Sequence, residues 1–332
     1  MLGARFEAEI REQPRVWRAI AASDTAQRLA GAVAGRDLLF LGSGSSLFVG
    51  MLGALAFRRR GVRAAALAAT EARFDRNAYR DACVVALSQS GRSSDLLEAI
   101  DVLDAAPLVA LTNDVHSPLA ERAKIVIDAM AGPEHAVPAS KSVTSMAAIV
   151  LWAAALTGGA RNRTAQTLEA TANDVDAWLA SESGLDDVVE AARRLSRRRS
   201  VAVVGAGYGV PIAYELALKM KEASYVHAEG FPAGEFRHGS SAMLDASSAI
   251  VGIVDEASRD VVRRPLAEAV EAEAARYVIG APCDDIPLLG PSTGEAFNTL
   301  AWLVAGQYLA LCVGRANFVE SDAPRGLRKF ML

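Results

Sequence analysis

Short apolar runs alternate with helical stretches along most of this chain. From Asp37 onward the candidate strands and helices are, in order, Leu38–Leu41, Ser46–Phe57, Ala64–Ala68, Cys83–Leu87, Ser94–Leu103, Leu108–Leu111, Ile125–Ile127 and Ser142–Leu156. Strands that are separated by helices are typical of a parallel sheet covered on both faces. The first ~30 residues instead predict an amphipathic helix, with apolar positions such as Ile10 and Trp17 among charged ones.

A polar helical stretch at about 161–183 leads into a second, similar round. Its candidate elements are Val201–Val204 (strand), Pro211–Val226 (helix), Ile250–Val254 (strand), Val261–Ala274 (helix), Tyr277–Ile279 (strand) and Glu295–Cys312 (helix). Both rounds open with a strand that runs into a glycine-containing turn, Leu38–Gly44 and Val201–Gly207, which indicates a weak internal duplication. The sequence therefore predicts an α/β protein with two domains, at 31–160 and 184–316. A helical segment at 1–30 precedes them, a helical linker at 161–183 joins them, and a tail at 317–332 follows.

Composition limits the class of protein. The 332 residues suit two domains of average size, and a hydrophobic content of 52% predicts a sizeable core. The formal net charge of −4 gives no support for nucleic-acid binding, which has a basic footprint. Cys83, Cys283 and Cys312 lack metal-ligand spacing, so we expect buried thiols in a reducing, cytoplasmic setting, with no metal and no cofactor.

Two segments, Met146–Thr157 and Leu300–Val313, are apolar enough to raise the question of a membrane. Both fall short of the ~20 residues that a membrane-spanning helix requires. The charged N-terminus, with Glu7, Glu9 and Glu12, does not resemble a signal peptide. We therefore interpret the two apolar segments as helices of a large core or of a subunit interface, and expect no membrane partner.

Polar residues follow two of the predicted strands in the first round. Gly42–Ser46 (GSGSS) ends one strand and opens a helix, where backbone N–H groups can hold a phosphate. Ser88–Asp95 (SQSGRSSD) follows another strand and also precedes a helix. A helix cap needs only one serine, whereas this loop has four hydroxyl groups and an amide. The second loop therefore indicates an anion-binding site.

Three segments resemble the SIS (sugar isomerase) domain family. Ser88–Asp95 resembles its SQSG-x-[ST]-x-D loop, Gly44–Ser46 its G-[TS]-S turn, and Gly132–Ser142 its GxE-x-x-VA[ST]TK stretch. The resemblance covers nearly the whole chain. It points to the group with two such domains, each a flavodoxin-like, doubly wound sheet, typified by the isomerase half of glucosamine-6-phosphate synthase and by stand-alone glucosamine-6-phosphate deaminases.

The resemblance implies a set of ligand-binding residues. A sugar 6-phosphate would be bound by Ser46, Ser88, Gln89, Ser90 and Ser93, and the sugar itself by the backbone of Val137 together with Glu134 and Arg328. In the second round, Asp255 and Glu256 stand where another phosphate loop would fall. Two acidic residues there should repel phosphate, so we expect one phosphate site per chain.

The predicted helix Pro211–Val226 carries several charged residues. Glu215, Lys219 and Glu222 share one helix face, and taken alone their spacing indicates a solvated face with an i,i+4 ion pair. However, Lys219–Glu229 resembles the family's KLKE-x-SY-x-HAE motif, and Ala233–Gly239 resembles its AGE-x-[KR]HG loop.

These two motifs imply the reacting groups. Glu222 would move a proton between C1 and C2 of an open-chain sugar, Lys219 would support it, and His238 would assist ring opening. The residue types suit the chemistry, because aldose–ketose interconversion needs one base that takes and returns a proton. Histidine titrates in the right range for a proton shuttle.

The end of the chain, Asp322–Lys329, resembles the family's D-x-PRNLAK terminus. This implies that Lys329 can form a Schiff base with a ketose and that the tail closes the active site. Three positions depart from the family's pattern: Ser240 stands where proline is usual, Gly326 replaces an asparagine, and Pro138 replaces a small residue. None removes a reacting group, but together they leave the substrate's identity open.

The synthase that this chain resembles has an N-terminal glutaminase domain with a cysteine next to the initiator methionine, whereas position 2 here is Leu2. We therefore expect the reverse reaction, from glucosamine 6-phosphate or a close analogue to fructose 6-phosphate and ammonia. Two alternatives stay open: a deglycase of 6-phosphorylated sugar–amine adducts, and a non-catalytic sugar-phosphate sensor. Glu222, His238 and Lys329 favour an enzyme, because a sensor needs only the serine loop. We also expect a homodimer with shared active sites, from the resemblance and from apolar surface on the two apolar helices.

Overall fold

The structure is a computed structural model that describes residues 1–72, 74, 77–103, 107–159, 161–291 and 298–329. Its residues group into two compact units that do not follow the order of the chain. The β1–β5 unit comprises residues 15–134 and 141–170, and the β6–β9 unit comprises residues 1–14, 135–140 and 171–329. Residues 135–140 thus group with the β6–β9 unit, although they lie inside the range predicted for the first domain, 31–160. Two helices, α1 (Ala4–Ala21) and α8 (Arg161–Ala180), contribute residues to both units.

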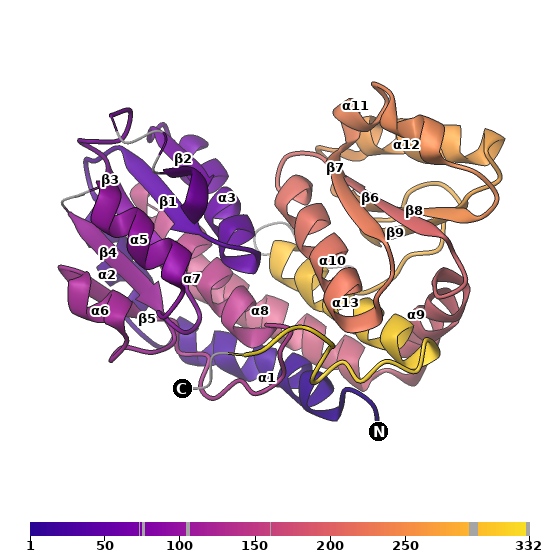
Figure 1. Ribbon diagram of the computed structural model, residues 1–332, viewed down its shortest axis with the longest axis horizontal. Coiled ribbons are helices and arrows are strands. Elements are labelled where there is room, and N and C mark those ends of the chain that lie inside the picture. Colours follow the sequence, from indigo (N-terminus) through magenta and orange to yellow (C-terminus); the bar gives the residue numbers. More distant parts are fainter. Residues whose placement is uncertain (73, 75–76, 104–106, 160, 292–297, 330–332) are drawn as a thin grey trace. The chain divides into compact units, whose positions relative to one another are not determined.

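The β1–β5 unit is built around one parallel sheet (Figure 1). Its further elements are α2 (Thr25–Val33), β1 (Leu38–Gly42), α3 (Ser45–Arg58), β2 (Ala64–Ala68), α4 (Ala69–Ala72), β3 (Cys83–Ser88), α5 (Ser94–Leu103), β4 (Leu108–Thr112), α6 (Pro118–Arg122), β5 (Ile125–Asp128) and α7 (Lys141–Thr157). The strand order is β2-β1-β3-β4-β5, as in flavodoxin-like folds. Leu39 and Leu41 pack with Leu96 of α5 on one face, and Phe40 points to the other face, where it contacts Gly50 of α3.

The β6–β9 unit has a smaller parallel sheet of order β7-β6-β8-β9. Its elements are α9 (Glu182–Leu195), β6 (Ser200–Gly205), α10 (Gly209–Ser224), β7 (Ala228–Pro232), α11 (Ala233–Phe236), the 3-10 helix η1 (Ser240–Met243), β8 (Ser248–Val254), α12 (Arg259–Glu271), β9 (Ala275–Gly280) and α13 (Asn298–Ala316). Val204 packs with Phe236 of α11 and Leu266 of α12 on one face. On the other face α10 lies against the sheet and packs against α13.

The predicted fold class is confirmed, since two parallel sheets flanked by helices are present. Each predicted strand is found within two residues of its expected bounds. β7 was not predicted, because Gly230 and Pro232 argue against a strand; proline is tolerated here because β7 is an edge strand. The single N-terminal helix proved to be two, α1 and α2, and the polar stretch at 161–183 belongs to α8 and the start of α9.

The two apolar segments form α7 and α13, and both are buried within the chain. Every side chain from Lys141 to Ala154 and from Thr299 to Gly314 is buried. α13 is long and apolar enough to cross a membrane, but 89% of its apolar window is buried, as in a core helix. The expectation that these helices offer apolar surface to a second copy is therefore wrong, because other parts of the chain already cover them. The predicted start of the last helix, Glu295, lies outside the described residues.

Candidate active site

Two loops leave the carboxyl edge of the β1–β5 sheet from the adjacent strands β1 and β3. The first leads into α3 and the second into α5, and these helices cover opposite faces of the sheet. In open parallel sheets, ligands bind outside the carboxyl ends of strands at the point where the connections turn to opposite faces. The topology alone therefore favours a ligand at this edge.

The loop between β3 and α5 is held in shape by its own hydroxyl groups. The Oγ of Ser88 accepts the backbone N–H of Gly91 at 3.0 Å, and the Oγ of Ser90 accepts that of Arg92 at 3.2 Å. Both serines are buried, and Ser93, just before α5, is partly exposed. A hydroxyl that accepts a backbone N–H keeps its own O–H to donate. The predicted phosphate ligands can therefore shape the loop and still bind an anion.

Gln89 adds a donor that needs an acceptor. Its Nε2 atom is buried and has no hydrogen-bond partner within the described part of the chain. Leaving a buried donor unsatisfied costs about 1–3 kcal/mol, so an anion bound at this loop would remove a penalty. The backbone around it is already fixed, because the Gln89 carbonyl accepts Asn113 N–H at 3.2 Å and the Gly91 carbonyl accepts Leu119 N–H at 3.1 Å.

Ser46 lies in the first turn of α3 and is partly exposed. Its backbone N–H donates to the Ser43 carbonyl at 3.2 Å, which closes the turn after β1. The structure therefore places the predicted phosphate ligands, Ser46, Ser88, Gln89, Ser90 and Ser93, on two neighbouring strand connections at one edge of the sheet.

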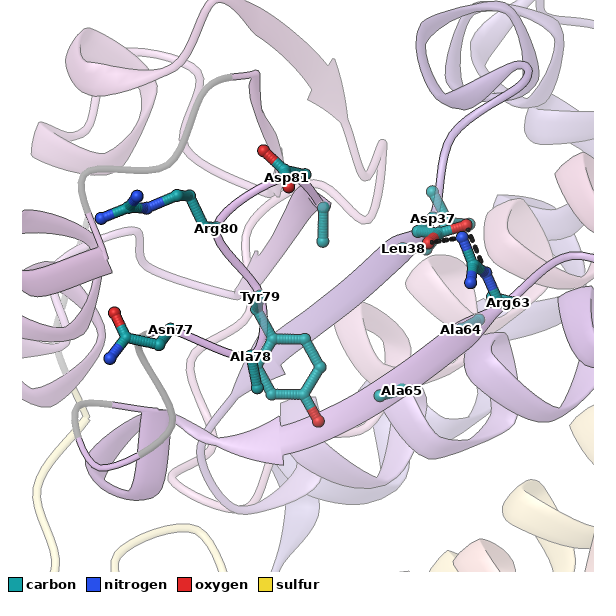
Figure 2. A pocket seen from close by; sticks show the side chains of 11 residues that line it. Asp37, Leu38, Arg63, Ala64, Ala65, Asn77, Ala78, Tyr79, Arg80 and Asp81 are labelled. Atoms are coloured by element: carbon teal, nitrogen blue, oxygen red, sulfur yellow. Dashed lines mark hydrogen bonds and ion pairs between the residues drawn. The ribbon is translucent and has the colours of Figure 1, made fainter.

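A cavity of about 340 Å³ opens at the opposite, amino edge of the same sheet. Asp37 and Arg63, which line it, form an ion pair at 2.6 Å, whereas Asn77 and Arg80 extend away from that pair (Figure 2). Its polar groups do not converge on one point, so we do not assign the sugar phosphate to it.

The β6–β9 unit contains a buried group of charges on α10. The Nζ of Lys219 donates to Oε2 of Glu222 and lies 3.5 Å from Oε1 of Glu215. The side chain of Lys219 is 1% exposed and that of Glu215 2%, whereas that of Glu222 is 20% exposed. A buried lysine thus holds a carboxylate that solvent, and therefore a ligand, can still reach.

This helix face is not the solvated one that its spacing alone indicates. Trp302, Leu303 and Gly306 of α13 face Glu215 and Lys219 across a narrow apolar gap, which excludes water from the pair. Glu215 was not among the predicted site residues. The sequence feature that could have indicated Glu215 is its position one helical turn before Lys219.

His238 is exposed and follows α11. Its backbone N–H donates to the Glu235 carbonyl at 2.9 Å, and its side chain makes no hydrogen bond within the described residues. The structure therefore does not join it to Lys219 or Glu222, and its role in ring opening stays a prediction.

The C-terminal tail returns to the segment 135–140 of the same unit. The Nζ of Lys329 donates to the Ala136 carbonyl at 2.6 Å, and the N–H of Val137 donates to the Asp322 carbonyl at 3.0 Å. Glu9, which is buried on α1, accepts the N–H of Ala136 at 3.3 Å. Lys329 is thus brought to the segment that is predicted to contact the sugar, whereas the N–H of Val137 is already bound.

The other two predicted sugar contacts differ from each other. Glu134 is 6% exposed, and its carboxylate accepts the N–H of Ser142 at 3.0 Å and the hydroxyl of the same serine at 2.7 Å. It therefore caps the start of α7, where a carboxylate suits the helix dipole. Arg328 is exposed on the tail.

The cysteines are not candidate nucleophiles. Burial raises the pKa of the Cys83, Cys283 and Cys312 thiols, that of Cys312 to about 12. Thiols whose pKa is raised above its ordinary value stay protonated near neutral pH and pack as small apolar groups. Among the described residues, no group of three His, Cys, Asp or Glu side chains could hold a metal ion.

Two parallel sheets flanked by helices, a serine loop at a carboxyl edge, and a buried lysine that holds a partly exposed carboxylate define a two-sheet α/β protein. The SIS domain family matches residues 34–156 and 194–279, so the chain belongs to that family. The resemblance inferred from the motifs is therefore confirmed.

Similarity extends over nearly the whole chain. The glutamine–fructose-6-phosphate aminotransferase (isomerizing) of Sulfolobus acidocaldarius is 31% identical over 299 residues, which are 88% of this chain and 49% of that protein. The chain spans about half the length of the curated relatives that it matches.

Two solved structures share the fold. The C-terminal domain of glucosamine-fructose-6-phosphate aminotransferase from Francisella tularensis has a TM-score of 0.82 at 23% identity and covers 96% of this chain and 98% of its own. Glucosamine-6-phosphate deaminase from Thermotoga maritima has a TM-score of 0.81 at 18% identity, with 98% of each chain covered.

Proposed function

We propose that this protein is an aminosugar-phosphate isomerase/deaminase that converts glucosamine 6-phosphate, or a close analogue, to fructose 6-phosphate and ammonia. The observation that carries the proposal is the pair formed by Lys219 and Glu222, in which a buried cation orients a reachable carboxylate. A base that takes a proton from one sugar carbon and returns it to the next must be both fixed and accessible. The names of the similar proteins, an aminotransferase of fructose 6-phosphate and a glucosamine-6-phosphate deaminase, support an amino sugar phosphate as the substrate.

In the proposed reaction the serine loop and Gln89 bind the phosphate, and His238 assists opening of the sugar ring. Glu222 then removes the proton from C2 of the open-chain aldehyde, which gives an enolamine, and delivers a proton to C1. The resulting imine at C2 is hydrolysed by water, so that the nitrogen leaves as ammonia and the ketose remains. Lys329 would hold the ketose carbonyl as an imine with loss of water.

The test of this mechanism is proton exchange in heavy water. Wild-type protein should convert glucosamine 6-phosphate to fructose 6-phosphate that carries solvent deuterium at C1. Glu222→Gln should still bind the substrate but lose turnover by about 10²–10⁴-fold, the usual effect of removing a positioned acid–base group. Glu271→Gln, which changes an exposed glutamate on α12 outside the family motifs, is the matched control and should be fully active. Normal turnover by Glu222→Gln would exclude the assigned role.

The same assay separates the alternatives. Ammonia from glucosamine 6-phosphate supports the deaminase. Amine release from 6-phosphorylated sugar–amine adducts alone would instead identify a deglycase. Tight binding of sugar phosphates with neither turnover nor deuterium exchange would identify a sensor.

We further propose a homodimer in which His238 of one copy serves Glu222 of the other. The exposed position of His238, without a side-chain hydrogen bond of its own, supports this arrangement. Mixing Glu222→Ala with His238→Ala under conditions of subunit exchange should then restore about a quarter of wild-type activity, because one site of each mixed dimer is intact. No recovery after verified exchange would exclude the shared site.

A further inference from the structure

The residue that ends α10 has an unusual backbone conformation. Tyr225 is the C-cap of this helix, with φ 59° and ψ 16°, in the left-handed region. Helices commonly end with glycine in this conformation, because a Cβ atom is strained there. A tyrosine at this position needs a reason, and its side chain supplies one.

Both ends of the Tyr225 side chain bind one residue of the C-terminal tail. The hydroxyl oxygen accepts the backbone N–H of Arg325 at 2.6 Å, and the guanidinium carbon of Arg325 lies 4.4 Å from the centre of the aromatic ring. A hydrogen bond and a cation–π contact at one residue restrict both its backbone and its side chain.

Side-chain contacts at Asp322 and Arg325 are among those that anchor the tail before it reaches Lys329. The carboxylate of Asp322 accepts the N–H groups of Arg5 and Phe6 at the start of α1, at 3.0 and 2.8 Å. After Asp322, the next side chain that holds the backbone of the tail is that of Tyr225, at Arg325. Lys329 follows four residues later and donates to the Ala136 carbonyl.

We propose that Tyr225 is a positioning residue that ties the tail to the end of α10 and thereby keeps Lys329 in place. The inference rests on the proposed function only for the role of Lys329, not for the anchoring itself. It connects two parts of the candidate machinery within one unit, since Tyr225 lies three residues after Glu222 on the segment that leaves α10.

Three variants test the anchor. Tyr225→Gly removes both contacts but relieves the left-handed strain, so the protein should still fold. Tyr225→Phe keeps the ring and removes only the hydroxyl. Phe318→Gly is the matched control, because Phe318 is also left-handed (φ 57°), follows α13 and is 87% exposed.

Hydrogen exchange of the amide of Arg325, followed by mass spectrometry of the intact protein's peptides, gives the direct measurement. Loss of one hydrogen bond should speed exchange by about fivefold in Tyr225→Gly and Tyr225→Phe, and Phe318→Gly should match the wild type. Unchanged exchange in Tyr225→Gly would overturn the inference, whatever the activity.

Reduction with borohydride in the presence of fructose 6-phosphate then reports on Lys329. Trapped sugar at Lys329 should fall several-fold in Tyr225→Gly and less in Tyr225→Phe, with kcat lowered more than KM is raised. Faster exchange with undiminished trapping would overturn the positioning role. If the wild type shows neither turnover nor trapping while exchange still responds to Tyr225→Gly, the anchor stands and the proposed function fails.

Discussion

The loops after β3 and β8 occupy equivalent places in the two sheets but are built differently. Each follows a strand that lies beside the first strand of its sheet, and each leads to a helix on the corresponding face, α5 or α12. In the loop after β3, backbone N–H groups donate to the neutral hydroxyls of Ser88 and Ser90. In the loop after β8, the N–H of Asp255 also donates to a hydroxyl, that of Ser258, at 3.0 Å, but the N–H of Ser258 donates to the carboxylate of Asp255 at 2.6 Å.

This difference decides which loop suits an anion. A hydroxyl satisfies a backbone donor without adding charge, so the serine loop itself carries no carboxylate before Asp95 in the first turn of α5. Asp255, three residues before Ser258 at the N-cap of α12, satisfies a donor with a carboxylate and so adds a negative charge that disfavours an anion in this loop. The two halves share a fold, and this difference between their loops supports the expectation of a single phosphate site per chain.

The two halves share the close approach between the end of the first strand of the sheet and the helix that follows it. A Cβ atom at Gly42 would lie 2.7 Å from the carbonyl carbon of Ser46, and one at Gly205 would lie 2.2 Å from the Gly209 oxygen. Both strand ends approach the following helix so closely that only glycine fits.

Among the variants that test the difference between the two loops, Gly91→Ala is expected to change stability and sugar-phosphate affinity most. Gly91 has φ 61°, and a Cβ atom there would lie 2.0 Å from the Ser117 hydroxyl oxygen. Left-handed strain and overpacking together should cost about 2–4 kcal/mol of unfolding free energy and displace the serine loop. Urea unfolding and sugar-phosphate titration measure the two effects. Ala257→Gly, in the loop after β8, should leave sugar-phosphate affinity at the wild-type value. Unchanged affinity in Gly91→Ala would show that this loop is not the phosphate site.

A smaller effect is expected from removing single hydroxyls. Ser90→Ala and Ser93→Ala should each weaken sugar-phosphate binding by about 1.5–3 kcal/mol, the usual loss for a hydrogen bond to a charged group. Isothermal titration with phosphorylated and dephosphorylated sugar measures this, and the latter should bind poorly to all variants. Ser258→Ala makes the same change in the equivalent loop and should leave the affinity intact. Equal affinities across the three variants would contradict the assignment.

The smallest effect is expected from Asp255→Ala. Loss of the carboxylate that accepts the N–H of Ser258, the N-cap residue of α12, should lower the unfolding free energy by about 1 kcal/mol, the usual net value of one hydrogen bond. Sugar-phosphate affinity should not change, because the second loop is not expected to bind phosphate. If this variant gained a second phosphate-binding site, the expectation of a single phosphate site per chain would hold only because of the charge at position 255.

The chain's local pattern was sufficient for the strands, for most of the helices and for the serine loop. Alternation of apolar runs with helical stretches predicted β1–β6, β8 and β9, and the run of serines after β3 identified the loop whose geometry now supports anion binding. β7 was not predicted, because Gly230 and Pro232 weaken its strand signal. The burial of Glu215 was not predicted, because the charged residues of a helix face have the same spacing whether the face is solvated or buried.

Periodicity and residue type are local properties, so the amino-acid sequence alone sets the fold class, the serine loop and the position of Lys219 and Glu222 on one helix face. Tertiary packing decided that α13 covers Glu215 and Lys219 and turns their ion pair into an enclosed one, while Glu222 stays reachable. It also decided that Glu134 caps α7, and that Tyr225 and the segment 135–137 hold the tail. Some of these contacts join residues that are far apart in the chain, and others depend on the burial of a whole helix face. The local sequence pattern predicts neither kind.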